Sequence, residues 1–254
     1  MVDNRAEYQR MHDLEGSLWW YQILHEKILR QINRRFTPAD NPSILDAACG
    51  TGGLLSYLQK HGFHAICGFD YSSHGVAFSQ GRGLDVSFGD LRKVADFRPG
   101  SMFDVVICND ALYFLNDQEI KVALTDFKAK LNPGGILLIN IHAHEAFSGT
   151  HDVAVGSTRR FVLSDFSRYA KSAGLRISYH TYWPFILSLP IWLVREWQRR
   201  QIRRGKIDIQ TLESDVQYPG HFLNSILHFI TKTEQFLMPR GPFGSSLFLV
   251  LQVP

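Results

Sequence analysis

The sequence predicts an α/β fold, in which a doubly wound, mainly parallel sheet of seven strands has helices on both faces and an antiparallel last strand. Three observations support this prediction. Short apolar runs of strand length alternate with longer segments whose apolar residues recur at helical spacing. The alternation continues through residues 43–182, as in consecutive βαβ units. A last apolar run, residues 246–253, follows a long insertion and supplies the final strand.

The first half of the chain predicts a helical cap followed by four strands. Apolar residues within 1–37 recur at helical spacing, at Leu18, Tyr21, Leu24, Ile28 and Ile32. Two prolines within residues 36–42 break this pattern. The next apolar runs, residues 43–47, 64–69, 84–88 and 103–108, are predicted strands with helix-length segments between most of them.

The second half predicts two helices, three strands and an insertion. An amphipathic helix is expected over 117–131, ended by Asn132-Pro133-Gly134-Gly135 before a strand at 136–141. A helix at 164–173 and a strand at 175–182 follow. We therefore expect one domain, 1–254, with a helical cap (1–37), a cofactor-binding core (38–182), a helical lid insertion (183–244) and the last strand (245–254).

Composition excludes several classes of protein. The hydrophobic share is 45% and the charged share 20%, as in ordinary globular proteins. A net charge of +3 is too small to indicate nucleic-acid binding. Cys49, Cys67 and Cys108 form no CxxC pair, which argues against disulfides and structural zinc. The chain starts without the basic segment and apolar run of a secretory signal, so we predict a cytoplasmic protein.

A glycine-rich segment, residues 44–53, joins the first predicted strand to the first helix of the core. Its glycines suit a backbone that turns sharply and passes close to a ligand. The segment lacks the G-x-G-x-x-G spacing of dinucleotide sites and the Gly-Lys-Ser/Thr of a P-loop. A phosphate group is therefore a poor candidate for its ligand.

This segment resembles the first motif of the class I (Rossmann-like) methyltransferases that use S-adenosylmethionine, in particular the bacterial small-molecule type. In that motif an acidic residue ends the strand and small residues alternate with glycines; Asp46, Gly50 and Gly52 match it. Ala48 stands where the family more often has glycine. The resemblance implies S-adenosylmethionine as cofactor and S-adenosylhomocysteine as product.

Further matches to the family follow in the expected order along the chain. The resemblance implies that Asp70, after the second strand, accepts hydrogen bonds from the ribose hydroxyls of the cofactor. Asp90, after the third strand, stands where the family places a carboxylate against the adenine amino group. The implied cofactor-binding residues are Asp46, Ala48, Gly50, Gly52, Asp70, Tyr71, Asp90, Leu91 and Asn109. Each aspartate alone can equally be a solvated strand end or a helix cap. Their joint occurrence at successive strand ends favours a cofactor site.

The acceptor is expected beyond the carboxyl ends of the fourth and fifth strands. Methyl transfer is an in-line displacement, so a base is needed only when the nucleophile must lose a proton. For a hydroxyl acceptor a histidine is the natural base. The catalytic candidates are His151, ranked first, His144 and Tyr113. An alternative is that His142 and His144 bind metal, since an H-x-H alternation on a strand projects both side chains to one face; we predict no metal.

Substrate-binding candidates come from several segments. His151-Asp152 and Arg159-Arg160 resemble a pattern after the fifth strand of similar methyltransferases, and the cluster 18–21 resembles an N-terminal helix that covers the cofactor. The candidates are Trp20, His142, Asp152, Arg159, Arg160 and Trp183. Alternatively, Arg159 and Arg160 lie on a solvent-exposed segment that leads into the next helix.

The lid insertion predicts two helices, 191–202 and 222–237. Its aromatic and apolar residues Trp183, Phe185, Ile186, Trp192 and Trp197 either line an apolar acceptor pocket or form the core of the lid. A basic run follows, at Arg195, Arg199, Arg200, Arg203, Arg204 and Lys206. Three interpretations are open: these residues form a solvent-exposed helix face, they bind an acidic acceptor, or they contact an anionic membrane.

These observations predict methyl transfer from S-adenosylmethionine to a small, apolar or aromatic metabolite, with O-methylation favoured over N- or C-methylation. Nucleic-acid methylation is disfavoured because residues 109–112 lack the Asn/Asp-Pro-Pro-aromatic motif. A non-catalytic module that senses the cofactor or recruits a partner is the alternative. The sequence does not indicate the oligomeric state.

Overall fold

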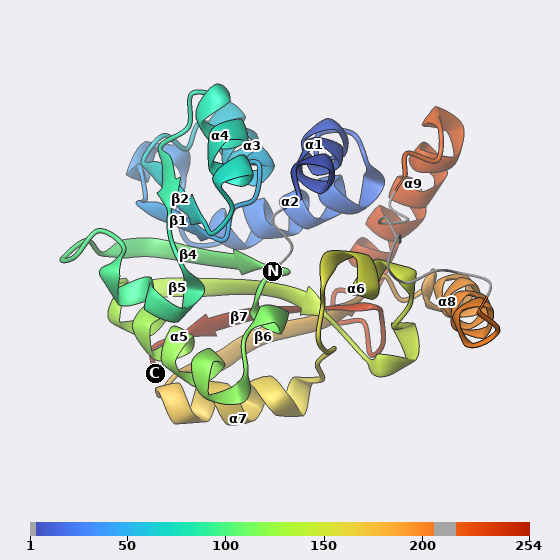
Figure 1. The fold of residues 1–254 in the computed structure, drawn as a ribbon. Coiled ribbons are helices and arrows are strands. Elements are labelled where there is room, and N and C mark those ends of the chain that lie inside the picture. The colour runs from blue at the N-terminus through green and yellow to red at the C-terminus, as the bar shows by residue number, and fades with distance from the viewer. Residues whose placement is uncertain (1–3, 206–216) are drawn as a thin grey trace.

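The computed structural model, which describes residues 4–205 and 217–254, contains a seven-stranded sheet in the order β3-β2-β1-β4-β5-β7-β6 (Figure 1). The strands are β1 (Ile44–Ala47), β2 (Ile66–Asp70), β3 (Val86–Phe88), β4 (Phe103–Asn109), β5 (Leu131–His142), β6 (Arg176–Trp183) and β7 (Ser246–Gln252). The first five are parallel, and β7 runs antiparallel to both β5 and β6. The predicted fold class is confirmed.

Helices cover both faces of this sheet. The helices of the described residues are α1 (Arg5–Leu14), α2 (Trp19–Ile32), α3 (Gly53–Lys60), α4 (Ser73–Gly81), α5 (Asp117–Ala129), α6 (Thr150–Val155), α7 (Leu163–Ala173), α8 (Ser188–Arg203) and α9 (His221–Leu237). Figure 1 shows α2, α3 and α4 on one face of the sheet and α5 and α7 on the other. Because both faces are covered, the central strands are buried along their length, which explains their continuous apolar runs.

Two hydrophobic cores flank the sheet. Ile44, Val105 and Leu138 face one core, where they pack with Ile28 of α2 and Leu55 of α3. The alternate strand residues face the other core, together with residues of α5 and α7, as in Leu45, Val106, Leu137, Leu124 and Phe166. This alternation along each strand follows from the two-residue period of a β-strand.

One predicted boundary is wrong at the start of β5. The segment Asn132-Pro133-Gly134-Gly135 was expected to be a turn before the strand, whereas β5 already begins at Leu131. Leu131 pairs with Phe103 and Ile136 with Val105, so the segment between them forms an irregularity within the strand. Asp104 stabilises it by accepting a hydrogen bond from Asn132 Nδ2 at 2.9 Å.

Other element ends differ by a few residues. β2 and β3 each begin two residues later than predicted, and α8 begins at Ser188 rather than at residue 191. Pro190 lies in the first turn of α8, where the missing N–H breaks no intrahelical hydrogen bond. The predicted start of this helix was therefore about one turn too late.

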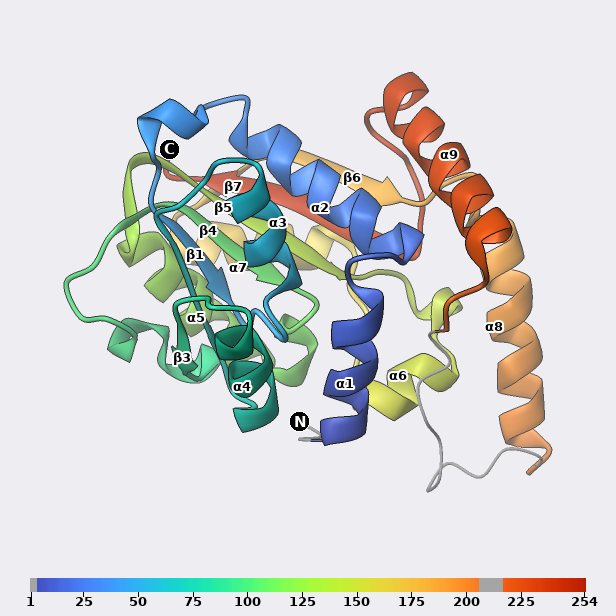
Figure 2. The same ribbon diagram turned by 90° about the horizontal axis from the view of Figure 1, so that it is seen from above.

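The order of the strands reverses between β1 and β4, which places a crevice at their carboxyl ends. The cap and the lid insertion meet at this end of the molecule. Figure 2 shows α1 beside the carboxyl ends of the strands and α8 and α9 together at one end of the molecule. Residues 206–216 of the lid insertion, including Lys206, lie outside the described residues. Within 4–205 and 217–254, none of the helices combines the length and hydropathy needed to cross a bilayer.

Candidate active site

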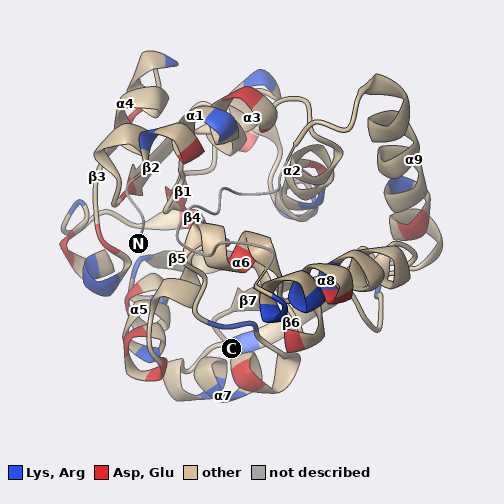
Figure 3. Ribbon diagram, turned by 45° about the vertical axis from the view of Figure 1, so that its right-hand side comes forward, with Lys and Arg blue, Asp and Glu red and all other residues tan. Residues whose placement is uncertain are grey.

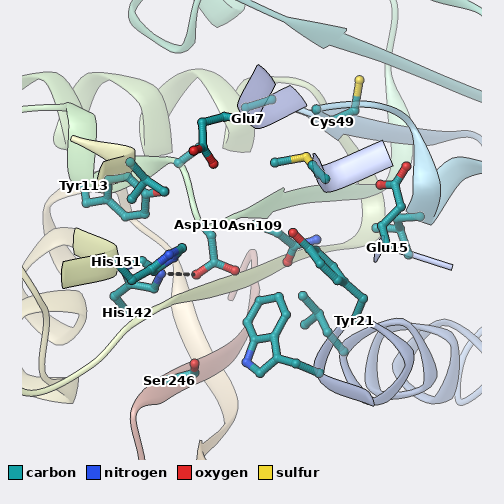
Figure 4. Close-up of a pocket in the computed structure, with 18 of the residues that line it drawn as sticks. Glu7, Glu15, Tyr21, Cys49, Asn109, Asp110, Tyr113, His142, His151 and Ser246 are labelled. Carbon is teal, nitrogen blue, oxygen red and sulfur yellow. Dashed lines mark ion pairs between the residues drawn. The ribbon is translucent and has the colours of Figure 1, made fainter. Parts of the chain in front are cut away.

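A cavity of about 470 Å³ opens over the carboxyl ends of β1, β2, β4 and β5. Its walls come from the glycine-rich segment, the ends of these strands, the cap and the lid insertion (Figure 4). Asp46, Ala48 and Asp70 line one end of the cavity. Asp110 and His142 line the other end. The cavity therefore brings together the residues predicted for the cofactor and several of those predicted for the acceptor.

The glycine-rich segment turns through three residues with positive φ, namely Ala48 (62°), Gly50 (56°) and Gly52 (80°). There is also no room for a side chain at residue 52, because a Cβ there would lie 2.5 Å from Leu84 Cδ1. Gly52 does not line the cavity but shapes the turn. Ala48 does line it and adopts the left-handed conformation at a cost of roughly 1 kcal/mol.

Three buried carboxylates gather at this end of the cavity. Asp46, Asp70 and Glu15 line it, and each is at most 4% exposed. Burial raises the pKa of Asp46 well above its usual value, and the nearby charges of Asp70 and Glu15 raise it further. Like charges in a desolvated site are unfavourable unless a cation compensates them. Arg82 compensates the charge of Glu15, so the space beside Asp46 and Asp70 suits a ligand that carries a positive charge.

Asp70 also organises the backbone around it. Its Oδ2 accepts a hydrogen bond from Gly50 N at 2.8 Å, and its Oδ1 accepts from Ser72 N at 2.9 Å and from Tyr8 Oη at 3.2 Å. An ionised carboxylate has about four acceptor positions. The Tyr8 hydroxyl therefore competes with any ligand hydroxyl that Asp70 binds.

Asp90 lies differently from its predicted place. Tyr71 and Leu91 line the cavity, but Asp90 does not. The Asp90 side chain caps the 3-10 helix Leu91–Asp96 and forms an ion pair with Arg92 at 2.7 Å. Asp90 therefore acts as a helix cap, which was the alternative to a cofactor-binding role. Asn109, the remaining cofactor candidate, does line the cavity.

Asp110 is the principal polar group at the opposite end. It follows β4 with φ at 46°, and its Oδ2 accepts a hydrogen bond from Asn140 Nδ2 at 2.7 Å. Its Oδ1 is buried and has no hydrogen-bond partner among residues 4–205 and 217–254. Figure 4 shows Asp110 between the His142–His151 pair and Tyr21.

Burial perturbs the pKa values of the groups around Asp110. It raises the pKa of Asp110 to about 7, although the Asn140 hydrogen bond and the Arg160 charge oppose this shift. Burial and the Arg160 charge lower the pKa of His142 well below its usual value, so its imidazole is neutral. His142 Nε2 lies 3.7 Å from Asp110 Oδ1, which is too long for a hydrogen bond. The two groups face the same space without being bonded to each other.

Two catalytic candidates lie beside this pair. The Tyr113 ring stacks on the His142 ring with centroids 4.8 Å apart, and the His151 ring lies 5.6 Å from that of His142. Both residues line the cavity. Burial raises the pKa of Tyr113 well above its usual value, so its hydroxyl stays protonated.

His144, the third catalytic candidate, faces away from the cavity. The strand ends at His142, and the chain turns at His144 with φ at 53°. The His144 ring packs against Tyr182 and Phe243. The expectation that His142 and His144 share one face is wrong, because it assumed that the strand continues.

Of the substrate-binding candidates, Trp20, His142 and Arg160 line the cavity. Asp152 lies behind them and forms a bidentate pair with Arg160, at 2.8 and 3.0 Å. Arg159 points elsewhere and pairs with Asp117. Trp183 is buried behind Trp20, with ring centroids 5.4 Å apart.

Trp183 supports the site from behind. Its Nε1 donates to Asn140 Oδ1 at 2.9 Å, and Asn140 in turn donates to Asp110. The other aromatic and apolar residues proposed for an acceptor pocket, Phe185, Ile186, Trp192 and Trp197, do not line the cavity and are exposed. The lid insertion contributes Ile191 and Arg195 of α8 instead.

Glu15 is a site residue that the sequence analysis missed. It lies at the end of α1 and accepts hydrogen bonds from Thr51 Oγ1 and from Gly53 N at 3.0 Å. Arg82 Nη2 pairs with it at 2.5 Å. The carboxylate fills the space beside Gly53, where a Cβ would meet it at 2.2 Å. Glu15 thus fastens the cap to the glycine-rich segment.

Glu15→Ala is expected to lower the free energy of unfolding by about 2 kcal/mol, since it leaves buried donors without a partner. Urea unfolding followed by tryptophan fluorescence measures the change. Glu26→Ala, which removes an ion pair with Lys232 near the surface, is the matched control and should cost much less. Equal losses in the two variants would contradict this role of Glu15.

Comparison with known proteins agrees with this geometry. A family model described as a methyltransferase domain matches residues 20–181, which is more than half of the chain. The chain belongs to the methyltransferase domain family. Its cofactor is S-adenosylmethionine, as predicted from the glycine-rich segment and the acidic residues at the strand ends.

Several curated relatives match part of the chain. The dTDP-3-amino-3,4,6-trideoxy-alpha-D-glucopyranose N,N-dimethyltransferase of Streptomyces venezuelae is 32% identical over 38% of this chain and 41% of its own length. A dTDP-3-amino-3,6-dideoxy-alpha-D-glucopyranose N,N-dimethyltransferase of Streptomyces fradiae is 28% identical over 59% and 61%. The trans-aconitate 2-methyltransferase of Mycobacterium tuberculosis is 33% identical over 39% and 36%. The matched regions thus span less than two thirds of each relative.

Solved structures share the fold. An S-adenosylmethionine-dependent methyltransferase from Archaeoglobus fulgidus has a TM-score of 0.56 at 12% identity and covers 91% of this chain and 93% of its own. Another from Clostridium acetobutylicum has a TM-score of 0.53 at 12% identity and covers 90% of each chain. At such low identity the likeness concerns the fold alone.

Proposed function

We propose that this protein transfers the methyl group of S-adenosylmethionine to a hydroxyl oxygen of a small, apolar or aromatic acceptor. The main support is the buried carboxylate of Asp110, whose pKa is raised to about 7 and whose Oδ1 accepts no hydrogen bond from the part of the chain that the structure describes. It lies in the cavity that also holds the cofactor residues. A group with a pKa near neutrality is an effective general base. A hydroxyl acceptor needs such a base, because it must lose a proton.

The cofactor supplies an electrophilic methyl group, and the chain's residues position and deprotonate the acceptor. Aromatic side chains at the cavity wall, such as Trp20, Tyr21 and Phe147, offer contacts to an apolar ring. Asp110 accepts the hydroxyl proton, while neutral His142 and the neighbouring His151 lie beside it to orient the acceptor. The Trp183–Asn140–Asp110 chain of hydrogen bonds holds the base in place.

An amine acceptor is the second candidate. A buried carboxylate also binds an ammonium group, and two of the relatives are named as N,N-dimethyltransferases of amino sugars. The two candidates differ in which atom gains the methyl group.

Product analysis tests both. The protein would be incubated with methyl-labelled S-adenosylmethionine and matched phenol and aniline or alcohol and amine pairs, followed by mass spectrometry. The proposal predicts label on oxygen. Label on nitrogen alone would favour the second candidate, and absence of label on any acceptor would favour a non-catalytic, cofactor-sensing module.

The pH dependence of the reaction should report Asp110. Because its pKa is raised to about 7, the base form accumulates only as the pH rises through that value. We expect kcat/KM to rise about tenfold per pH unit below neutrality and to level off above it. Asp110→Asn should abolish this rising limb, measured as initial rates in a constant-ionic-strength buffer series. A limb that persists in the variant would assign it to another group.

A further inference from the structure

The two helices of the lid insertion turn their apolar sides outward. On α9, Phe222, Phe229 and Phe236 recur every seven residues, which places them on one face, and they are 82%, 71% and 84% exposed. The buried residues of this helix are polar, namely Asn224, Thr231, Glu234 and Gln235. This is the reverse of the pattern on a helix that packs on a core with its apolar face.

The buried polar residues of α9 explain the inversion. Asn224 Oδ1 accepts from Trp19 N at 2.8 Å, which satisfies a free N–H at the start of α2. Glu234 accepts from Phe185 N and Ile186 N, both at 2.7 Å, just before α8. The polar face is thus used to join the cap to the lid insertion, and the phenylalanines point to solvent.

The same inversion occurs on α8. Its buried residues are Ser188 and Gln198, whereas Leu189, Leu193, Val194 and Trp197 are exposed. Arg199 on the inner side donates to Ala146 O and Ser148 O, at 2.7 and 2.8 Å. Both helices stand at the same end of the molecule (Figure 2). Their exposed apolar residues define what we term the α8–α9 face.

Charge indicates what covers the α8–α9 face. Of the five arginines between Ser188 and the C-cap of α8, Arg200, Arg203 and Arg204 are exposed, and only Arg200 of these pairs with Glu196 among the described residues. Figure 3 shows basic residues gathered on α8 while α9 is mostly uncharged. Two copies of such a face would repel each other, whereas an anionic lipid surface would attract it. Exposed tryptophans, at 192 and 197, suit the interface between lipid and water.

We propose that the α8–α9 face docks on an anionic lipid bilayer and lies in its interface. Apolar side chains enter the boundary of the acyl chains while the exposed Arg203 and Arg204 contact the lipid phosphates. Ile191 and Arg195 of α8 line the cavity, so the docked surface borders the site of the acceptor. The docking requires no particular acceptor, and its failure leaves the proposed methyl transfer untouched.

Co-sedimentation with vesicles tests this proposal. The purified protein would be mixed with vesicles of equimolar phosphatidylglycerol and phosphatidylcholine, or of phosphatidylcholine alone. We expect binding to the anionic vesicles that weakens with added salt, and much weaker binding to the neutral ones. Arg203→Gln/Arg204→Gln should weaken binding about 30-fold, because each arginine near the surface contributes on the order of 1 kcal/mol.

Apolar variants separate docking from charge attraction alone. Phe229→Ser/Phe236→Ser and Leu193→Ser/Trp197→Ser should each release the protein from anionic vesicles. Met102→Ser/Val122→Ser removes exposed apolar side chains elsewhere and should bind like the unchanged protein. Affinity for S-adenosylhomocysteine, measured by calorimetry, verifies that each variant is folded.

Three outcomes would overturn the proposal. The first is no binding to anionic vesicles, and the second is binding that the apolar variants leave unchanged. The third is a dimer in analytical ultracentrifugation that Phe229→Ser/Phe236→Ser dissociates. That result would assign the α8–α9 face to a second copy of the chain.

Discussion

Asp110→Asn is expected to lower kcat by about 10²- to 10⁴-fold, the range that a general base contributes. The substitution preserves the shape of the side chain, and its amide oxygen can still accept the hydrogen bond from Asn140 Nδ2. An amide, however, cannot take up a proton. Affinity for S-adenosylhomocysteine should change little, since Asp110 is not among the residues predicted to bind the cofactor. Single-turnover kinetics with a labelled acceptor measure the loss.

Asp96→Asn is the matched control, because Asp96 is exposed on the 3-10 helix after β3 and does not line the cavity. Asp96→Asn should have the same kcat as the unsubstituted protein. His151→Gln in parallel identifies the group that acts as base. If His151→Gln removes the reaction and Asp110→Asn does not, the base is His151, as the sequence analysis ranked it.

Asp70→Ala is expected to raise the dissociation constant of S-adenosylhomocysteine about 100-fold, because hydrogen bonds to a charged group are worth roughly 1.5–3 kcal/mol each. The loss has two sources in the geometry. A carboxylate that can accept ligand hydroxyls disappears, and Gly50 N loses the partner that holds the glycine-rich segment in its turn. Isothermal calorimetry measures the change.

Asp85→Ala, which removes an exposed ion pair with Arg98 just before β3, serves as the control for this experiment. Asp70→Asn retains one acceptor oxygen and should lose less affinity than Asp70→Ala. Thermal unfolding checks that both variants fold. Unchanged affinity in Asp70→Ala would show that the ribose contact has been misplaced.

Much of the fold was predictable because it depends on local patterns. Strand-length apolar runs are visible in sequence and are imposed by a sheet that is buried on both faces. The glycine turn is visible because its backbone adopts positive φ at Gly50 and Gly52. The irregularity at Asn132–Gly135 was not predictable, because it depends on the pairing of Asn132 with Asp104 across two strands.

The site was predictable only in part, because neighbouring residues diverge once the chain leaves a strand. His142 and His144 were grouped by spacing, but the left-handed turn at His144 separates them. Arg159 and Arg160 were grouped in the same way and point to Asp117 and Asp152 respectively. Asp110 appeared among the polar residues after the fourth strand. Its burial, and the lack of a hydrogen bond to its Oδ1 within residues 4–205 and 217–254, depend on contacts distant in sequence.

The most direct test of the account is a crystal structure with S-adenosylhomocysteine. We predict that the adenosine end lies near Asp70 and Tyr71 and that the sulfur faces the space bounded by Asp110, His142 and His151. A ligand bound with its sulfur directed away from Asp110, or bound outside this cavity, would contradict the proposed site.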